Sequence, residues 1–163
     1  MNVSKMKLTI VGICGVLLVP FTGHAANATL LNDTTALFTV DFSFTDDYFE
    51  VQVPIMAEYG VDYLDRVDTV GYDFVTTEND LPEIENISGL VLSNETIVGN
   101  KYVLPTGSTG KFTLMVLVTF TEEIGEDVQA MITKLPYFLN ERRTTVHQNQ
   151  LDELAMPILE AAE

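Results

Sequence analysis

The chain has 163 residues, with 24 acidic side chains against eight Lys and Arg, and its formal net charge is −16 at pH 7. A charge of this sign repels nucleic acids and anionic lipid surfaces and attracts cations, so we expect no nucleic-acid partner. The length suffices for one domain with a hydrophobic core. Cys14 is the single cysteine, which excludes an internal disulfide.

The first 28 residues have the pattern of a secretory signal peptide. Lys5 and Lys7 precede an apolar run at residues 8–21, and the small residues that follow allow cleavage after Ala25 or Ala28. The run is about 14 residues long, whereas a helix that spans a membrane needs roughly 20 residues. We therefore expect cleavage, no retained membrane span, and a protein located outside the cell or at the cell envelope.

After residue 35, apolar and polar residues alternate along most of the chain, as they do in strands with one buried face. In chain order, the pattern predicts strands at residues 36–44, 48–58, 70–76 and 87–92, followed by a hairpin at 96–104 around Gly99 and Asn100. Pro54 has no amide donor, which favours an edge position or a bulge for the second of these strands.

The next stretch, LPTGSTGKFTLMVLVTF at residues 104–120, is a turn followed by a strand. Its predicted inward-facing residues are Phe112, Leu114, Val116, Val118 and Phe120. On the opposite face, Met115 and Leu117 interrupt a row of threonines. Two explanations remain open: the C-terminal segment at 151–159 covers these two side chains, or they mark a surface for contact with another protein.

A last strand is predicted at residues 128–135, and residues 140–163 are predicted to form a polar linker and C-terminal tail. Leu151 and Leu154 fit one face of a helix that Pro157 interrupts, so a short helix and an extended tail both remain open. Short strands between clusters of Gly, Pro, Asn and Asp are typical of antiparallel sandwiches. We therefore predict an all-β fold over residues 29–163: a single antiparallel, immunoglobulin-like β-sandwich of about seven or eight strands.

The sequence contains no recognisable catalytic arrangement. Cys14 would leave with the signal peptide, and His147 would be the only histidine in the cleaved chain, so neither cysteine catalysis nor a histidine zinc cluster is available. No Gly-x-Ser-x-Gly motif is present to supply an activated serine. We therefore expect a protein that is not an enzyme and that has no organic cofactor.

Four carboxylates in one acidic stretch are the candidates for a metal site. They are Asp62, Asp65, Asp68 and Asp73. Calcium prefers several oxygen ligands from a loop, which makes this stretch a calcium candidate. The spacing lacks the Asp-x-Asp-x-Asp-Gly pattern, so a solvated acidic loop is the alternative.

The segment from Leu90 to Phe120 resembles the immunoglobulin-like or fibronectin-like β-sandwich modules of bacterial surface proteins. These modules often carry a turn and strand of the form Pro-x-Gly-x-x-x-x-Phe-Thr-Leu. The matching residues here are Pro105, Gly107, Phe112, Thr113 and Leu114. The resemblance implies a β-sandwich and a role in adhesion, spacing or binding at the cell envelope, although such a fold does not determine function.

These observations favour a secreted, non-enzymatic protein with a structural or protein-interaction role and an unidentified protein or envelope partner. A ligand-binding module, for carbohydrate or calcium, is the alternative. An exposed apolar patch or an unprotected edge strand would support the first hypothesis. Aromatic side chains aligned on one exposed face, or carboxylate oxygens that converge in a loop, would support the second.

Overall fold

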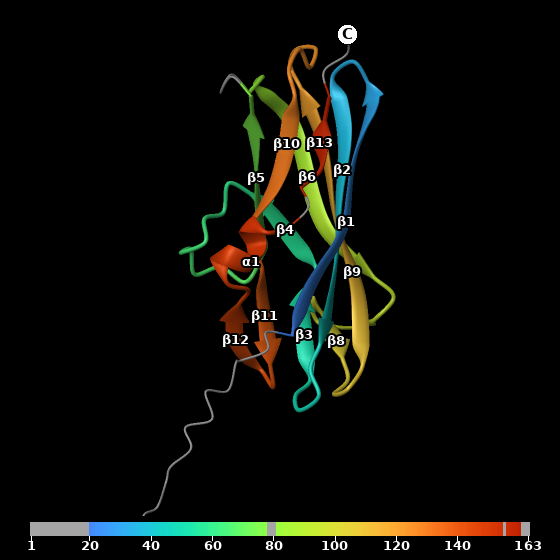
Figure 1. Ribbon diagram of the computed structural model, residues 1–163, viewed down its shortest axis with the longest axis vertical. Coiled ribbons are helices and arrows are strands. Elements are labelled where there is room, and N and C mark those ends of the chain that lie inside the picture. The colour runs from blue at the N-terminus through green and yellow to red at the C-terminus, as the bar shows by residue number, and fades with distance from the viewer. Residues whose placement is uncertain (1–19, 78–80, 155, 161–163) are drawn as a thin grey trace, which may run out of the picture.

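The computed structural model describes residues 20–77, 81–154 and 156–160, which form two packed β-sheets (Figure 1). The larger sheet has eight strands, in the spatial order β1 (Phe21–Asn32), β2 (Thr35–Thr45), β9 (Thr109–Phe120), β6 (Ile84–Ser93), β4 (Met56–Tyr59), β5 (Val70–Thr76), β10 (Val128–Lys134) and β13 (Ile158–Leu159). The smaller sheet has five, in the order β12 (Arg142–Thr145), β11 (Pro136–Leu139), β3 (Val51–Pro54), β8 (Lys101–Leu104) and β7 (Thr96–Val98). The short helix α1 (Gln148–Asp152) follows β12.

The predicted all-β, sandwich-like fold is confirmed, with more strands than predicted. All strand pairs are antiparallel except β4 and β5, which run parallel. The larger sheet curls until its first and last strands, β1 and β13, lie in contact without a ladder between them. In Figure 1 the strands β5, β10 and β13 of this sheet lie in the upper part of the molecule, and β1, β2 and β9 run down into the lower half, where β3, β8, β11 and β12 lie. The larger sheet is therefore almost a barrel.

Two segments pass from one sheet to the other. β3 is followed by β4 at Ile55, and β10 is followed by β11 at Leu135. The Ile55 amide donates to the Asn100 carbonyl at 3.1 Å, and the Ile55 carbonyl accepts from the Val91 amide at 2.8 Å. Pro54 is the last residue of β3, so it marks the change of sheet.

The core lies between the inward faces of these strands. The five predicted inward residues of β9 are all buried, which confirms the alternation there. The rings of Phe42 on β2 and Phe112 on β9 stack at 5.6 Å between centroids. Because burying each large apolar side chain contributes about 1.5–3 kcal/mol, this aromatic core can stabilise the domain without a disulfide.

The C-terminal segment belongs to this core. β12 pairs with β11 through a two-residue turn at Asn140 and Glu141, whose φ angles are +47° and +68°. Leu151, Leu154 and Leu159 are buried in the core cluster, and β13 pairs with β10. The sequence left a short helix and an extended tail open, and both forms occur: α1 is the short helix, and β13 is the extended part. The explanation that it covers Met115 and Leu117 is wrong, because it packs against β10 and β1 instead.

The described part of the chain begins at residue 20, within the predicted signal peptide. Most of the predicted signal peptide lies outside the described residues, but β1 begins at Phe21 and passes through both predicted cleavage positions. Secretion and cleavage stay predictions. Among the described residues, no helix has the length and apolar character that a membrane crossing requires.

Alkaline pH is expected to destabilise the fold through its buried tyrosines. Burial raises the pKa of Tyr72 to about 12, with smaller contributions from the Glu58 charge and Tyr59, and burial also raises the pKa of Tyr137. Because the folded state favours the neutral phenol, this contribution is complete below the usual pKa of 10 and is lost as the pH rises towards 12. For Tyr72 the loss should reach up to about 2 kcal/mol. Urea unfolding across this range measures it, and Tyr72→Phe should flatten the dependence.

Candidate interaction surface

Apolar side chains line up across four strands on the outer face of the larger sheet. Leu117 on β9 lies opposite Leu37 on β2, and Met115 on β9 lies opposite Leu90 on β6. Leu90 in turn lies opposite Met56 on β4. Directly opposed side chains on one sheet face are close enough to touch. We call this set the outer apolar patch: Leu37, Met56, Leu90, Leu92, Met115 and Leu117.

The outer apolar patch is open to solvent. Leu117 is 39%, Leu92 43% and Met56 52% exposed, and the other members are half-buried. Side chains at such positions on a solvated sheet face are usually polar. Met115 and Leu117, selected from the sequence, therefore lie within a larger apolar surface. The register of the paired strands brings its other members next to them.

Carboxylates are scarce around this patch. The outward-facing residues that flank it on β2 and β9 are Thr35, Thr39, Asp41, Thr113 and Thr119. Asp41 accepts a hydrogen bond from the Thr113 hydroxyl at 2.6 Å, and the hydroxyls of Thr35 and Thr119 lie 3.2 Å apart. On β4, the exposed Glu58 lies two residues after Met56 and adds a second carboxylate at the margin of the patch. In a chain with 24 acidic residues, a patch with no carboxylate among its own members could be covered at a small desolvation cost.

The edge strands of the smaller sheet are a second candidate for contact. β7 forms one edge, and its Ile97 and Val98 are exposed large apolar residues. β12 forms the other edge and carries the exposed Arg142 and Arg143. Both strands are short, which is a common way to limit uncontrolled strand pairing.

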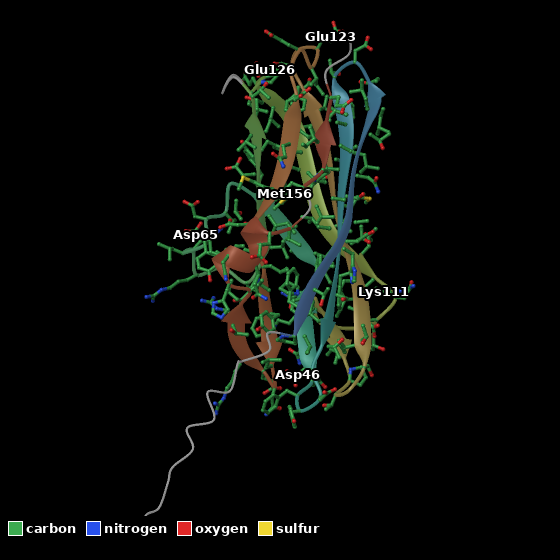
Figure 2. All side chains as sticks on the ribbon, in the orientation of Figure 1. Asp46, Asp65, Lys111, Glu123, Glu126 and Met156 are labelled. Atoms are coloured by element: carbon green, nitrogen blue, oxygen red, sulfur yellow. The ribbon has the colours of Figure 1, made fainter. Side chains whose placement is uncertain are left out.

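The four calcium candidates do not come together. The Asp65 carboxylate accepts from the Asp62 amide at 2.7 Å, whereas Asp68 pairs with Arg143 at 3.0 Å. Asp73 accepts from the Phe74 amide at 2.7 Å on β5, and Figure 2 shows Asp65 on the loop that projects from the side of the molecule. Within residues 20–77, 81–154 and 156–160, no three His, Cys, Asp or Glu side chains are placed to hold a metal ion.

Two basic side chains hold this acidic loop at residues 60–69. The Lys134 ammonium donates to the carbonyls of Asp65 and Val67, and Lys134 is only 1% exposed. Burial lowers the pKa of Lys134, and the Arg143 charge lowers it further, against opposing effects of Asp65 and Asp68. Arg143 donates to the Arg66 carbonyl and to Asp68 at 3.0 Å each. The sequence carried a signal for this role, because Lys134 occupies an inward position in the alternation of residues 128–135.

The exposed tyrosines do not form a row on one strand. Tyr72, Tyr102 and Tyr137 are buried. Tyr48 lies in the turn after β2 and Tyr59 at the end of β4, where the Tyr59 ring contacts the Tyr72 ring at 6.2 Å. An aligned aromatic platform for carbohydrate is therefore not formed by these residues.

A histidine–serine contact was not predicted. His24 Nε2 lies 2.8 Å from the Ser43 hydroxyl and joins β1 to β2. The nearby Asp41 carboxylate bonds to Thr113 rather than completing a relay through His24. The described geometry therefore gives this pair a positional role, in which it fastens β1 to β2.

Comparison with known proteins does not assign the chain to a family. No protein-family model matches it, and no curated protein is significantly similar to it. Function is therefore inferred from the geometry of the chain itself.

Proposed function

We propose that the chain is a secreted, non-enzymatic β-sandwich protein with a structural or protein-interaction role at the cell envelope or outside the cell. The observation that carries the proposal is the outer apolar patch around Met115 and Leu117. No described segment of the chain covers this patch. Removing exposed apolar side chains from water lowers the free energy, so a partner that covers the patch would be bound favourably.

The shape of the patch suggests what kind of partner fits. Leu37, Leu117, Met115 and Leu90 lie on neighbouring paired strands, so they form a sheet face rather than a pocket. Sheet faces pack against other sheets at about 10 Å, with side chains interdigitated. The partner we propose is therefore the same apolar sheet face of a second copy of this chain, and the surrounding threonines form a polar rim.

Replacing the two central side chains tests this proposal. We expect Met115→Thr/Leu117→Thr to weaken self-association by about tenfold or more, because each lost apolar contact is worth about 1 kcal/mol or more. The free energy of unfolding should change by less than about 1 kcal/mol, since both side chains face outward and threonine suits a strand. Sedimentation velocity over a concentration series measures association, and urea unfolding measures stability.

Val75→Thr supplies the matched control. Val75 is an exposed apolar residue of β5 in the same sheet but outside the patch, so its replacement should leave association unchanged. The proposed surface is wrong if the wild-type chain is a monomer at every concentration. It is also wrong if the double variant and V75T associate equally.

A further inference from the structure

The two halves of β1 are attached to β2 in different ways. Residues 26–30 pair with β2 in continuous register, and residues 21–23 pair with Phe42, Ser43 and Phe44. Between them the register breaks, and the break contains His24 and Ala25. The predicted cleavage after Ala25 therefore falls at the irregularity, so cleavage there would leave the regular half of β1 in place.

The segment before this break fills a specific site at the edge of the sheet. Phe21 is 9% exposed, and its ring lies 5.5 Å from the Phe44 ring and 6.1 Å from the Phe42 ring. The Pro20 carbonyl accepts from the Thr45 amide at 2.9 Å. Cleavage after Ala25 would uncover the core aromatic rings and leave the end of β2, residues 42–45, without its strand partner on this edge.

The site favours a small residue two positions after the aromatic one. A Cβ atom at Gly23 would collide with the tip of the Leu154 side chain, so a larger residue fits only if Leu154 moves. A cavity of about 310 Å³ adjoins this position, with Gln150 and Glu153 in its wall. The Gln150 side-chain oxygen is buried there and has no hydrogen-bond donor among the described residues. The site therefore favours a strand of the form aromatic–x–glycine.

We propose that residues 20–25 plug a strand-binding site that signal cleavage opens, and that its later occupant is an aromatic–x–glycine strand of a different protein. Phe21-Thr22-Gly23 is the only such sequence in the chain, so a second cleaved copy cannot supply the strand. Main-chain hydrogen bonds along the β2 edge provide affinity, and the Phe21 and Gly23 positions provide specificity. The inference rests on the secretion included in the proposed function but not on the outer apolar patch, so the two can fail separately.

Peptide binding to the chain that begins at Ala26 tests the inference. The probe is the synthetic peptide PFTGHA, which reproduces residues 20–25, and calorimetry and thermal unfolding are the measurements. We expect saturable binding and a higher unfolding temperature, and about tenfold or weaker binding for the Phe21→Ala peptide. The Gly23→Ala peptide should bind poorly to the wild-type chain and better to the Leu154→Ala variant, whose shortened side chain removes the collision. Absent binding, or equal binding of the Phe21→Ala peptide, overturns the proposal.

A second experiment covers the case in which the shortened chain does not fold. A protease site replaces His24 and Ala25 in the chain that begins at Pro20, and cleavage follows folding. The proposal is supported if labelled PFTGHA replaces the released segment and the Phe21→Ala peptide replaces it much less well. Failure to exchange overturns it. If the cleaved chain self-associates and the peptide suppresses this, the choice of a different protein as occupant is wrong. The Met115→Thr/Leu117→Thr variant should bind the peptide normally.

Discussion

Lys134→Met is expected to lower the free energy of unfolding by about 3 kcal/mol, because it removes two hydrogen bonds from a charged donor, each worth about 1.5 kcal/mol or more. The wild-type ammonium donates to the carbonyls of Asp65 and Val67, and it joins β10 to the acidic loop. Methionine has a similar length but donates no hydrogen bond. Urea unfolding measures the loss of stability. Faster amide hydrogen exchange at residues 61–69 would show that the loop has been released.

Lys111→Met is the matched control for this prediction. Lys111 is exposed on β9, so the same substitution there should change the free energy of unfolding by less than about 0.5 kcal/mol. Equal losses in the two variants would contradict a special role for Lys134.

The two lysines should also differ in their pH dependence. Burial lowers the pKa of Lys134 in the folded state, so over the range between that pKa and its usual value of 10.5 the unfolded chain binds more protons. The wild-type chain should gain stability from this group as the pH rises through that range. Lys134→Met should lose this gain, and Lys111→Met should keep it.

Alternation predicted the strands whose two faces differ clearly in polarity. The predicted strand at 70–76 has the same bounds as β5, and that at 36–44 lies one residue inside each end of β2. On β9 the inward phenylalanines and valines and the outward Met115 and Leu117 follow from the same period of two. Local burial alone determines this pattern, so no knowledge of the partner strands was needed.

Strand pairing across the chain could not be predicted in this way. The patch includes Leu37 and Leu90 because of the register of β2 and β6 on β9, which no local pattern contains. The turn at Asn140 and Glu141 lacks the glycine that usually marks a two-residue hairpin, so β11 and β12 were missed. The contact of Lys134 with the loop spans more than 60 residues, and the pairing of β10 with β5, in which Lys134 lies opposite Gly71, brings them together.

Gly89→Ala is expected to destabilise the fold by about 2–3 kcal/mol, because it overpacks the core at its centre. A Cβ atom at Gly89 would lie 2.5 Å from Cε1 and 2.8 Å from Cζ of the buried Tyr72 ring. Gly89 is paired with Val116 on one side and Ala57 on the other, so its backbone has little freedom to retreat. The ring must therefore move towards solvent.

Two measurements identify this mechanism. Urea unfolding gives the loss of stability, and ultraviolet absorbance follows the titration of Tyr72, whose pKa should fall from about 12 towards its usual value of 10 once burial decreases. Gly125→Ala is the control, because a Cβ atom there meets no neighbour within 4 Å, and it should be neutral or slightly stabilising. In the double variant Gly89→Ala/Tyr72→Leu, the smaller side chain should leave room for the methyl group, so the combined loss should be less than the sum of the single losses. Additive losses would show that the alanine methyl group does not act through the Tyr72 ring.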